Sequence, residues 1–184
     1  MSIDKIYDYH CNDNSDINEH LPTLKRYTEL CDTVIEMGVR TVVSTWAFLA
    51  GKPKKLTSID IVDPLKYNVS MDSIRALAKE NDTEFKFLLE DTTKIDLEEC
   101  DLLFIDTWHV YEQLKKELEL HGDKAKKYLI FHDTTTFAHR GETQGHVGLK
   151  PAIDEFLQQN SHWKVKEVFT NNNGLTILER VNSL

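Results

Sequence analysis

The stretch DLLFIDTWHVYEQLKKELELHGDKAKKYLIFHDT, residues 101–134, decides the fold that we expect for this chain. Two runs in it, LLFI and YLIF, are nearly unbroken apolar segments, which is typical of strands buried on both faces in the middle of a parallel sheet. Between them, residues 110–121 have the spacing of a helix. A strand, a helix and a second strand in this order predict a parallel βαβ unit.

The same alternation of short β-rich runs and longer helical runs extends along most of the chain. It predicts strands at residues 33–37, 56–62, 84–90, 101–107 and 128–134, and helices at residues 43–50, 70–81, 110–121 and about 149–160. Two last strands, 163–169 and 175–180, flank Asn172-Asn173-Gly174, whose residue types tolerate the positive φ of a hairpin turn. We therefore predict an α/β fold with a doubly wound, mostly parallel sheet of about seven strands and a C-terminal antiparallel hairpin.

The length of 184 residues favours one domain over residues 1–184, since domains commonly have roughly 100–200 residues. Residues 1–15 are polar and are expected to be irregular, and a leading helix is expected to open at Asp16. Residues 1–32 would form this N-terminal extension and helix, and residues 33–180 would form the core.

The charge balance excludes some partners. Thirty-one acidic and 22 basic residues give a net charge of −9, which argues against binding to nucleic acid or to an anionic membrane surface. The sequence has no apolar stretch of the roughly 18 residues that a membrane helix needs, and no visible secretory signal. We therefore expect a cytoplasmic protein, in which the three cysteines are reduced.

An acidic residue lies at or after the end of each of the first five predicted strands. Ligands of doubly wound sheets bind beyond the carboxyl ends of the strands, so these positions are candidate site residues. Carboxylates that meet at one edge repel each other unless cations or hydroxyl-rich ligands lie between them. Alternatively, each of them caps the helix that follows. The five residues are Glu36, Asp60, Asp91, Asp106 and Asp133.

Several of these segments resemble a known family. The runs VIEMGVRTVVSTWAFL, SIDIVDP, LLFIDTWHVYEQLKKEL and YLIFHDTTTF, within residues 33–180, are similar to class I methyltransferases that use S-adenosylmethionine. The branch that they most resemble is that of small metal-dependent O-methyltransferases, related to cephalosporin-hydroxylase-like proteins and macrolide sugar O-methyltransferases. This resemblance implies a Rossmann-like fold and transfer of a methyl group to a hydroxyl of a small molecule or a sugar.

The resemblance also implies roles for individual residues. Glu36 and Gly38 would form the first cofactor loop, where glycine lets the backbone approach the methionine part of the cofactor. Ser44 would contact the cofactor carboxylate, Asp60 the ribose hydroxyls, and Asp91 with Thr92 the adenine. A divalent metal, Mg²⁺ or Mn²⁺, would be held by Asp106, His132 and Asp133. Asp106 and His109 would be the catalytic residues, with His109 as general base toward the acceptor hydroxyl.

Two positions depart from the pattern of the family. Val42 stands where a second glycine is common, and valine does not take positive φ cheaply, so we expect the first loop to run differently or the cofactor to meet a changed backbone. His132 stands where an acid is usual, and an imidazole ligand suits Mn²⁺, Fe²⁺ or Zn²⁺ better than Mg²⁺.

Two other functions stay open. One is a metal-dependent hydrolase or sugar-modifying enzyme that uses the same aspartates. The other is a non-catalytic binding or assembly module, for which Val42 in place of glycine is the main argument. The oligomeric state is equally open between a monomer and a homo-oligomer, although small sheets of this type often pair to complete their substrate pockets.

Overall fold

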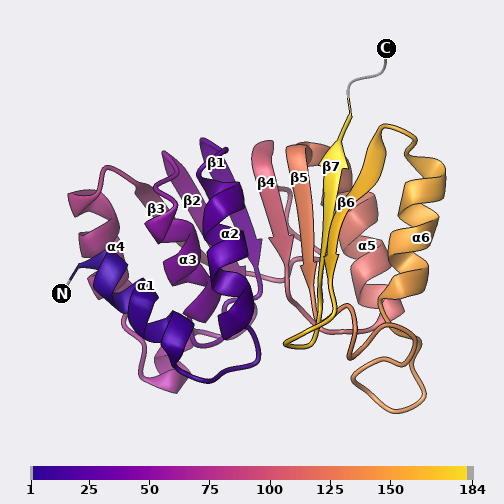
Figure 1. The fold of residues 1–184 in the computed structure, drawn as a ribbon, viewed down its shortest axis with the longest axis horizontal. Coiled ribbons are helices and arrows are strands. Elements are labelled where there is room, and N and C mark those ends of the chain that lie inside the picture. Colours follow the sequence, from indigo (N-terminus) through magenta and orange to yellow (C-terminus); the bar gives the residue numbers. More distant parts are fainter. Residues whose placement is uncertain (1, 182–184) are drawn as a thin grey trace. The chain divides into compact units, whose positions relative to one another are not determined.

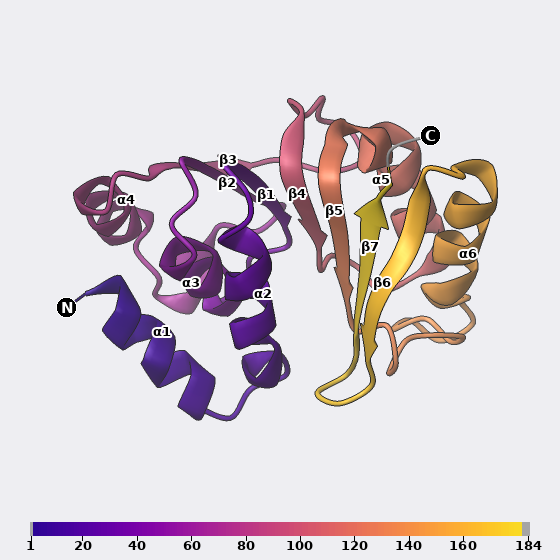
Figure 2. The ribbon, with the colours of Figure 1, turned by 45° about the horizontal axis from the view of Figure 1, so that its top comes forward.

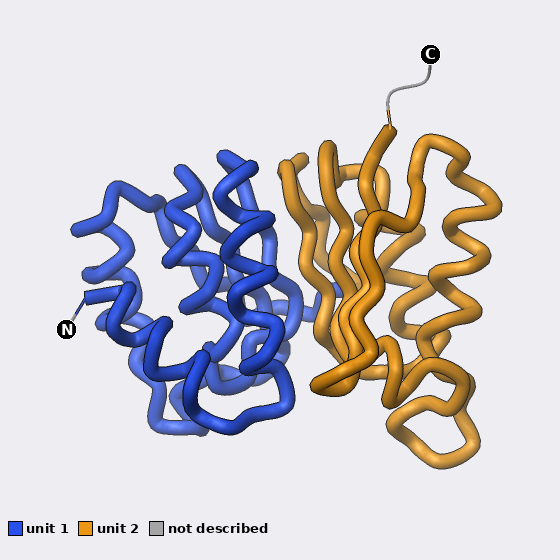
Figure 3. Tube along the Cα trace, in the orientation of Figure 1, with its two compact units in different colours: residues 1–92 blue, residues 93–184 orange. Residues whose placement is uncertain are grey.

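The computed structural model describes residues 2–181, which divide into two compact units, residues 2–92 and 93–181 (Figure 3). The boundary follows Thr92, between the third and the fourth strand. The prediction of a single domain stays a prediction, and each unit is described by itself.

The first unit contains three parallel strands in the order β3-β2-β1 (Figure 1). They are β1 (Thr33–Met37), β2 (Lys55–Asp60) and β3 (Glu84–Leu89). The helices are α1 (Ile3–Asn12), α2 (Leu21–Thr28), α3 (Val43–Ala50) and α4 (Met71–Glu80), with short 3-10 turns at Asn18–His20 and Pro64–Tyr67. Helix α3 is apolar on nearly all sides, and α1 and α2 both pack against it.

The second unit contains four strands in the order β4-β5-β7-β6. They are β4 (Cys100–Ile105), β5 (Ala125–His132), β6 (Trp163–Phe169) and β7 (Leu175–Arg180). The first two are parallel, whereas β7 runs antiparallel to both β5 and β6 (Figure 2). Helices α5 (Tyr111–His121) and α6 (Lys150–Gln159) pack on each other, and a 3-10 turn at Gly122–Lys124 leads into β5.

These strands and helices confirm the predicted fold class, an α/β Rossmann-like fold with seven strands, mostly parallel, and a C-terminal antiparallel hairpin. The apolar runs of residues 101–134 form β4 and β5, where Leu102, Phe104 and Phe131 are fully or almost fully buried. The hairpin turn also has the predicted backbone, with φ of 43° at Asn172, 71° at Asn173 and 98° at Gly174.

The N-terminus differs from the prediction, because residues expected to be irregular form α1. Ser2 caps this helix by accepting a hydrogen bond from the amide of Lys5, and only Ile3 and Tyr7 are buried. Two apolar residues four positions apart suffice to anchor the helix face, although they give too weak a pattern to predict it. Within residues 2–181, none of the helices has the length and apolar character needed to cross a membrane.

Candidate functional site

The loop between β1 and α3 has the left-handed turns of a glycine-rich loop. Gly38 has φ of 88°, and Val42, immediately before α3, has φ of 62° and ψ of 20°. The expectation that valine would make this loop run differently is therefore wrong for position 42 itself, which adopts the conformation that glycine would favour. Left-handed backbone costs about 1–2 kcal/mol for a residue with a side chain. Burial of the Val42 side chain, 3% exposed, offsets this cost.

Glu36 lies inside the first unit, with no exposed surface. Its carboxylate accepts hydrogen bonds from three hydroxyls: Ser44 at 2.6 Å, Thr45 at 2.8 Å and Ser58 at 2.5 Å. The structure thus places Glu36 beneath the loop, where it ties β1 to α3 and β2, and not on the exposed edge of the sheet that the sequence suggested. Ser44 is 5% exposed and directs its hydroxyl to Glu36.

Asp60, the last residue of β2, holds the same loop through its backbone. One carboxylate oxygen accepts from the amides of Val39 at 2.8 Å and Arg40 at 2.9 Å, and the other accepts from the amide of Val62 at 2.8 Å. A carboxylate has about four acceptor positions, so Asp60 keeps capacity for a ligand hydroxyl. Asp91 and Thr92 follow β3; Thr92 is buried and Asp91 is partly exposed.

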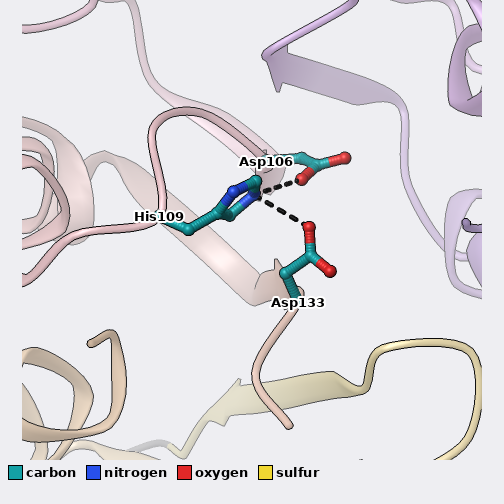
Figure 4. Close-up of side chains that lie close together, drawn as sticks. All are labelled: Asp106, His109 and Asp133. Carbon is teal, nitrogen blue, oxygen red and sulfur yellow. Dashed lines mark hydrogen bonds and ion pairs between the residues drawn. The ribbon is translucent and has the colours of Figure 1, made fainter. Parts of the chain in front are cut away.

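In the second unit, three of the predicted residues come together (Figure 4). Asp106 directly follows β4 and Asp133 directly follows β5, so the two parallel strands place their carboxylates side by side. The Nε2 atom of His109 lies 3.0 Å from Asp106 Oδ1 and 3.0 Å from Asp133 Oδ2. These three atoms form a compact group of donors that could hold a metal ion.

Asp133 has two unusual features. Its backbone is left-handed, with φ of 60°, which turns the chain sharply at the end of β5. Its Oδ1 atom is buried and has no hydrogen-bond partner among residues 2–181. A buried carboxylate oxygen without a partner carries a free-energy cost that a bound cation would remove.

His132 lies beside this group at longer distances. Its Nδ1 atom is 3.4 Å from Asp106 Oδ1 and 3.5 Å from Asp133 Oδ2, and its Nε2 is 3.3 Å from the carbonyl oxygen of Asn172. The histidine whose nitrogen lies at the centre of the group is thus His109, and His132 supports it from the buried side, at 1% exposure.

The charges in this group shift each other's pKa. Burial lowers the pKa of His109, but hydrogen bonds to Asp106 and Asp133 and their negative charges outweigh it and raise that pKa to about 10. The same balance raises the pKa of His132 to about 10. Conversely, burial raises the pKa of each aspartate, but the two histidines hold both values below the usual range.

The donor set fits a divalent metal. One imidazole nitrogen and two carboxylate oxygens are ligands for Mn²⁺, Fe²⁺ or Zn²⁺, and carboxylates alone also suit Mg²⁺. The unpartnered Oδ1 of Asp133 is the observation of this structure that favours a cation. Without a metal, the two carboxylates are bridged by Nε2 of a protonated His109.

One residue of the site was not expected from the sequence. Glu142, in the loop between β5 and α6, lies 3.0 Å from the second ring nitrogen of His109, Nδ1. It is 33 positions from His109 along the chain and belongs to no recognisable motif. Five of the eight histidines lie within residues 109–146, and this crowding is the sequence signal that points toward the loop.

Comparisons with known proteins gave matches to solved structures alone. No protein-family model matches the chain, and no curated protein matches it in sequence. An O-methyltransferase from Bacillus cereus in complex with SAH is similar, with a TM-score of 0.64 and 11% identity over 97% of this chain and 90% of that chain. A putative caffeoyl-CoA O-methyltransferase from Staphylococcus aureus is similar, with a TM-score of 0.64 and 14% identity over 97% of this chain and 98% of that one.

A third similar structure is magnesium protoporphyrin IX methyltransferase from Synechocystis PCC 6803 with bound SAH. Its TM-score is 0.63, with 15% identity over 97% of this chain and 93% of that chain. At these identities the similarity establishes the fold, which is that of class I methyltransferases.

Proposed function

We propose that this chain, which has the fold of class I methyltransferases, is an O-methyltransferase that uses S-adenosylmethionine and a divalent metal. Its acceptor would be a hydroxyl of a small molecule or a sugar. The observation that carries the proposal is the group of Asp106, His109 and Asp133, in which one imidazole nitrogen lies 3.0 Å from two carboxylate oxygens beyond the ends of two parallel strands.

Asp106, His109 and Asp133 would hold the metal, with His132 behind them. This set differs in one member from the set suggested by the resemblance, because His109 takes the place of His132. A bound divalent metal would lower the pKa of an acceptor hydroxyl and fix its position. The mixed nitrogen and oxygen donors favour Mn²⁺ over Mg²⁺.

The first unit would bind the cofactor, which supplies the methyl group. Gly38 has no side chain to prevent close approach of a ligand to the backbone, and Asp60 holds the next two amides in a fixed loop. Asp60 would also accept from ribose hydroxyls, while Asp91 and Thr92 would lie by the adenine. Glu36 and Ser44 would support the loop from within.

Methyl transfer from a sulfonium is an in-line displacement, so the protein mainly aligns the acceptor oxygen with the methyl group. Both ring nitrogens of His109 lie within 3.0 Å of carboxylate oxygens, at Asp106 and Asp133 on one side and at Glu142 on the other. We therefore assign His109 to hold the metal, in preference to the role of general base suggested by the resemblance. Asp106 and His109 remain the proposed catalytic residues, because they would hold the metal that acts on the acceptor hydroxyl.

A second candidate is a metal-dependent hydrolase or sugar-modifying enzyme. The observation that favours it is the position of the whole donor group within residues 93–184, independent of the residues proposed for the cofactor. This candidate predicts metal binding without any affinity for adenosyl ligands.

Isothermal titration with S-adenosylmethionine and S-adenosylhomocysteine, with and without Mn²⁺, distinguishes these candidates. A methyltransferase binds S-adenosylmethionine and its demethylated product, S-adenosylhomocysteine, at the same site. If neither ligand gives heat while Mn²⁺ does, the methyltransferase is excluded and the metal-dependent hydrolase is favoured.

A further inference from the structure

We propose that Glu142 is a positioning residue that fixes the orientation of His109 for metal binding. This inference rests on the proposed metal group of Asp106, His109 and Asp133 but concerns a residue outside it. Glu142 touches none of the three donor atoms of that group and would act through the opposite edge of the imidazole ring.

The two ring nitrogens of His109 face different partners. Nε2 points to Asp106 and Asp133, whereas Nδ1 lies 3.0 Å from Oε2 of Glu142. When Nδ1 carries the proton and donates a hydrogen bond to Glu142, Nε2 keeps its lone pair for a metal. A carboxylate on the far nitrogen of a ligating histidine thereby sets its tautomer and raises its basicity as a ligand.

Backbone contacts hold Glu142 in this position. The amide of Glu142 donates to the carbonyl oxygen of His109 at 3.0 Å, and the amide of His109 approaches Oε2 of Glu142 at 3.5 Å. The two residues are therefore joined in both directions, so a displacement of Glu142 would also displace the backbone that carries the imidazole.

The rest of the loop restricts the ring further. Phe137 stacks on His109, with ring centroids 4.9 Å apart and an angle of 12° between the planes. Next to Glu142, Thr143 accepts a hydrogen bond from Trp108 at 3.2 Å. The amide of Gly141 donates to the carbonyl oxygen of His146 at 2.9 Å, which closes the loop around Glu142. The imidazole can thus neither flip nor tilt without breaking contacts to this loop.

The test is a Mn²⁺ titration of the full chain by calorimetry, for the wild type, Glu142→Gln and Glu142→Ala. The matched control is Glu112→Gln, because Glu112 contacts the same loop, through His146 at 3.5 Å, but does not touch His109. Both glutamates are substantially exposed, at 49% and 62% of their side chains, so neither substitution disturbs the core.

We expect Glu142→Ala to weaken Mn²⁺ binding by about 10–100-fold, the usual effect of losing such a carboxylate partner. Glu142→Gln, which keeps an acceptor oxygen but not its charge, should lie between wild type and Glu142→Ala, and Glu112→Gln should bind as the wild type does. With Co²⁺ in place of Mn²⁺, the visible absorption band of the bound ion should change in Glu142→Ala only, because it reports the geometry of the ligands.

Equal affinities and equal Co²⁺ spectra for all four proteins would overturn the inference and leave the metal group intact. Absence of Mn²⁺ binding in the wild type would overturn both the metal group and the inference. Titration with S-adenosylhomocysteine remains independent of either result, so failure of the cofactor proposal is recognised separately.

Discussion

The hydroxyl of Ser58 donates a hydrogen bond of 2.5 Å to the carboxylate of Glu36, and both residues are completely buried. They are register partners on the neighbouring strands β1 and β2. Together with Ser44 and Thr45, Ser58 supplies hydrogen bonds that replace those of water to the carboxylate. These hydrogen bonds let Glu36 lie buried beneath the loop that follows β1.

Replacing Ser58 by alanine should destabilise the chain. A hydroxyl donor to a buried carboxylate is lost, and the cost of losing a buried hydrogen bond to a charged group is about 1.5–3 kcal/mol. Urea unfolding should show a decrease of this size in the free energy of unfolding. Ser73→Ala, at an exposed position of α4, should change it by less than about 0.5 kcal/mol. Equal effects of Ser58→Ala and Ser73→Ala would contradict the stabilising role of the hydrogen bond between Ser58 and Glu36.

At position 42, glycine should be better tolerated than alanine. Val42 has φ of 62°, a backbone that costs about 1–2 kcal/mol with any side chain but not with glycine. Both substitutions lose the buried methyl groups of valine, but only Val42→Gly releases the strain. In thermal and urea unfolding, the free energy of unfolding of Val42→Gly should therefore be higher than that of Val42→Ala by about 1 kcal/mol. The opposite order would mean that the loop is not left-handed at this residue.

Asp60→Asn should loosen the first loop more than Asp63→Asn. Asp60 accepts from three backbone amides, of Val39, Arg40 and Val62, whereas Asp63 accepts from one, that of Leu65. An amide group leaves one of its two ends unable to accept, so we expect a loss of about 1–3 kcal/mol of stability and weaker binding of S-adenosylhomocysteine in Asp60→Asn. Calorimetry on the two variants checks this, and equal affinities would remove Asp60 from the proposed cofactor site.

Metal binding should release a proton at neutral pH. In the metal-free chain the pKa of His109 is raised to about 10, so its imidazole is protonated at pH 7 and must lose a proton to bind a metal. Apparent Mn²⁺ affinity should therefore increase with pH between 6 and 9 and level off as the pH passes this pKa, with about one proton released per ion. Calorimetry in two buffers of different ionisation enthalpy measures the release, and a pH-independent affinity would contradict it.

The same pKa values give the sign of the effect on stability without metal. Because the pKa of His109 is higher in the folded chain, its contribution is fully present below the unfolded value of about 6.5 and is lost as the pH rises toward 10. The lowered pKa of Asp133 acts in the other direction, so its contribution is lost as the solution becomes acidic. The metal-free chain should be least stable at both extremes.

The fold was largely predictable from the sequence. The strands at Thr33–Met37, Trp163–Phe169 and Leu175–Arg180 have the predicted bounds, because runs of apolar and β-branched residues end at turn-forming residues. Helix α1 was missed because its sequence is polar apart from a few residues on one face. The predicted strand at 56–62 ends at Asp60, where the carboxylate captures the amide of Val62.

The candidate site was predictable in part. Asp106 and Asp133 follow apolar runs, so their place at the strand ends could be inferred from the sequence alone. The choice between His109 and His132 could not, because it depends on the left-handed turn at Asp133 and on the direction of each ring. Glu142 depends on the path of a long loop, for which local sequence carries little information.

The most direct test of the central claim is a Mn²⁺ titration of the wild type and of Asp133→Asn, followed by electron paramagnetic resonance of the free ion. Asparagine tolerates the left-handed backbone at position 133, so this variant removes the charge without adding backbone strain. The matched control is Asp154→Asn on α6, where the carboxylate pairs with Lys150.

The account predicts one tightly bound ion per chain in the wild type and in Asp154→Asn. Asp133→Asn removes a direct ligand of the metal. Its Mn²⁺ affinity should therefore fall by more than about 10–100-fold, which is the usual effect of losing a residue that only hydrogen-bonds to a ligand. Equal Mn²⁺ binding by all three proteins, or none by the wild type, would contradict the metal group of Asp106, His109 and Asp133.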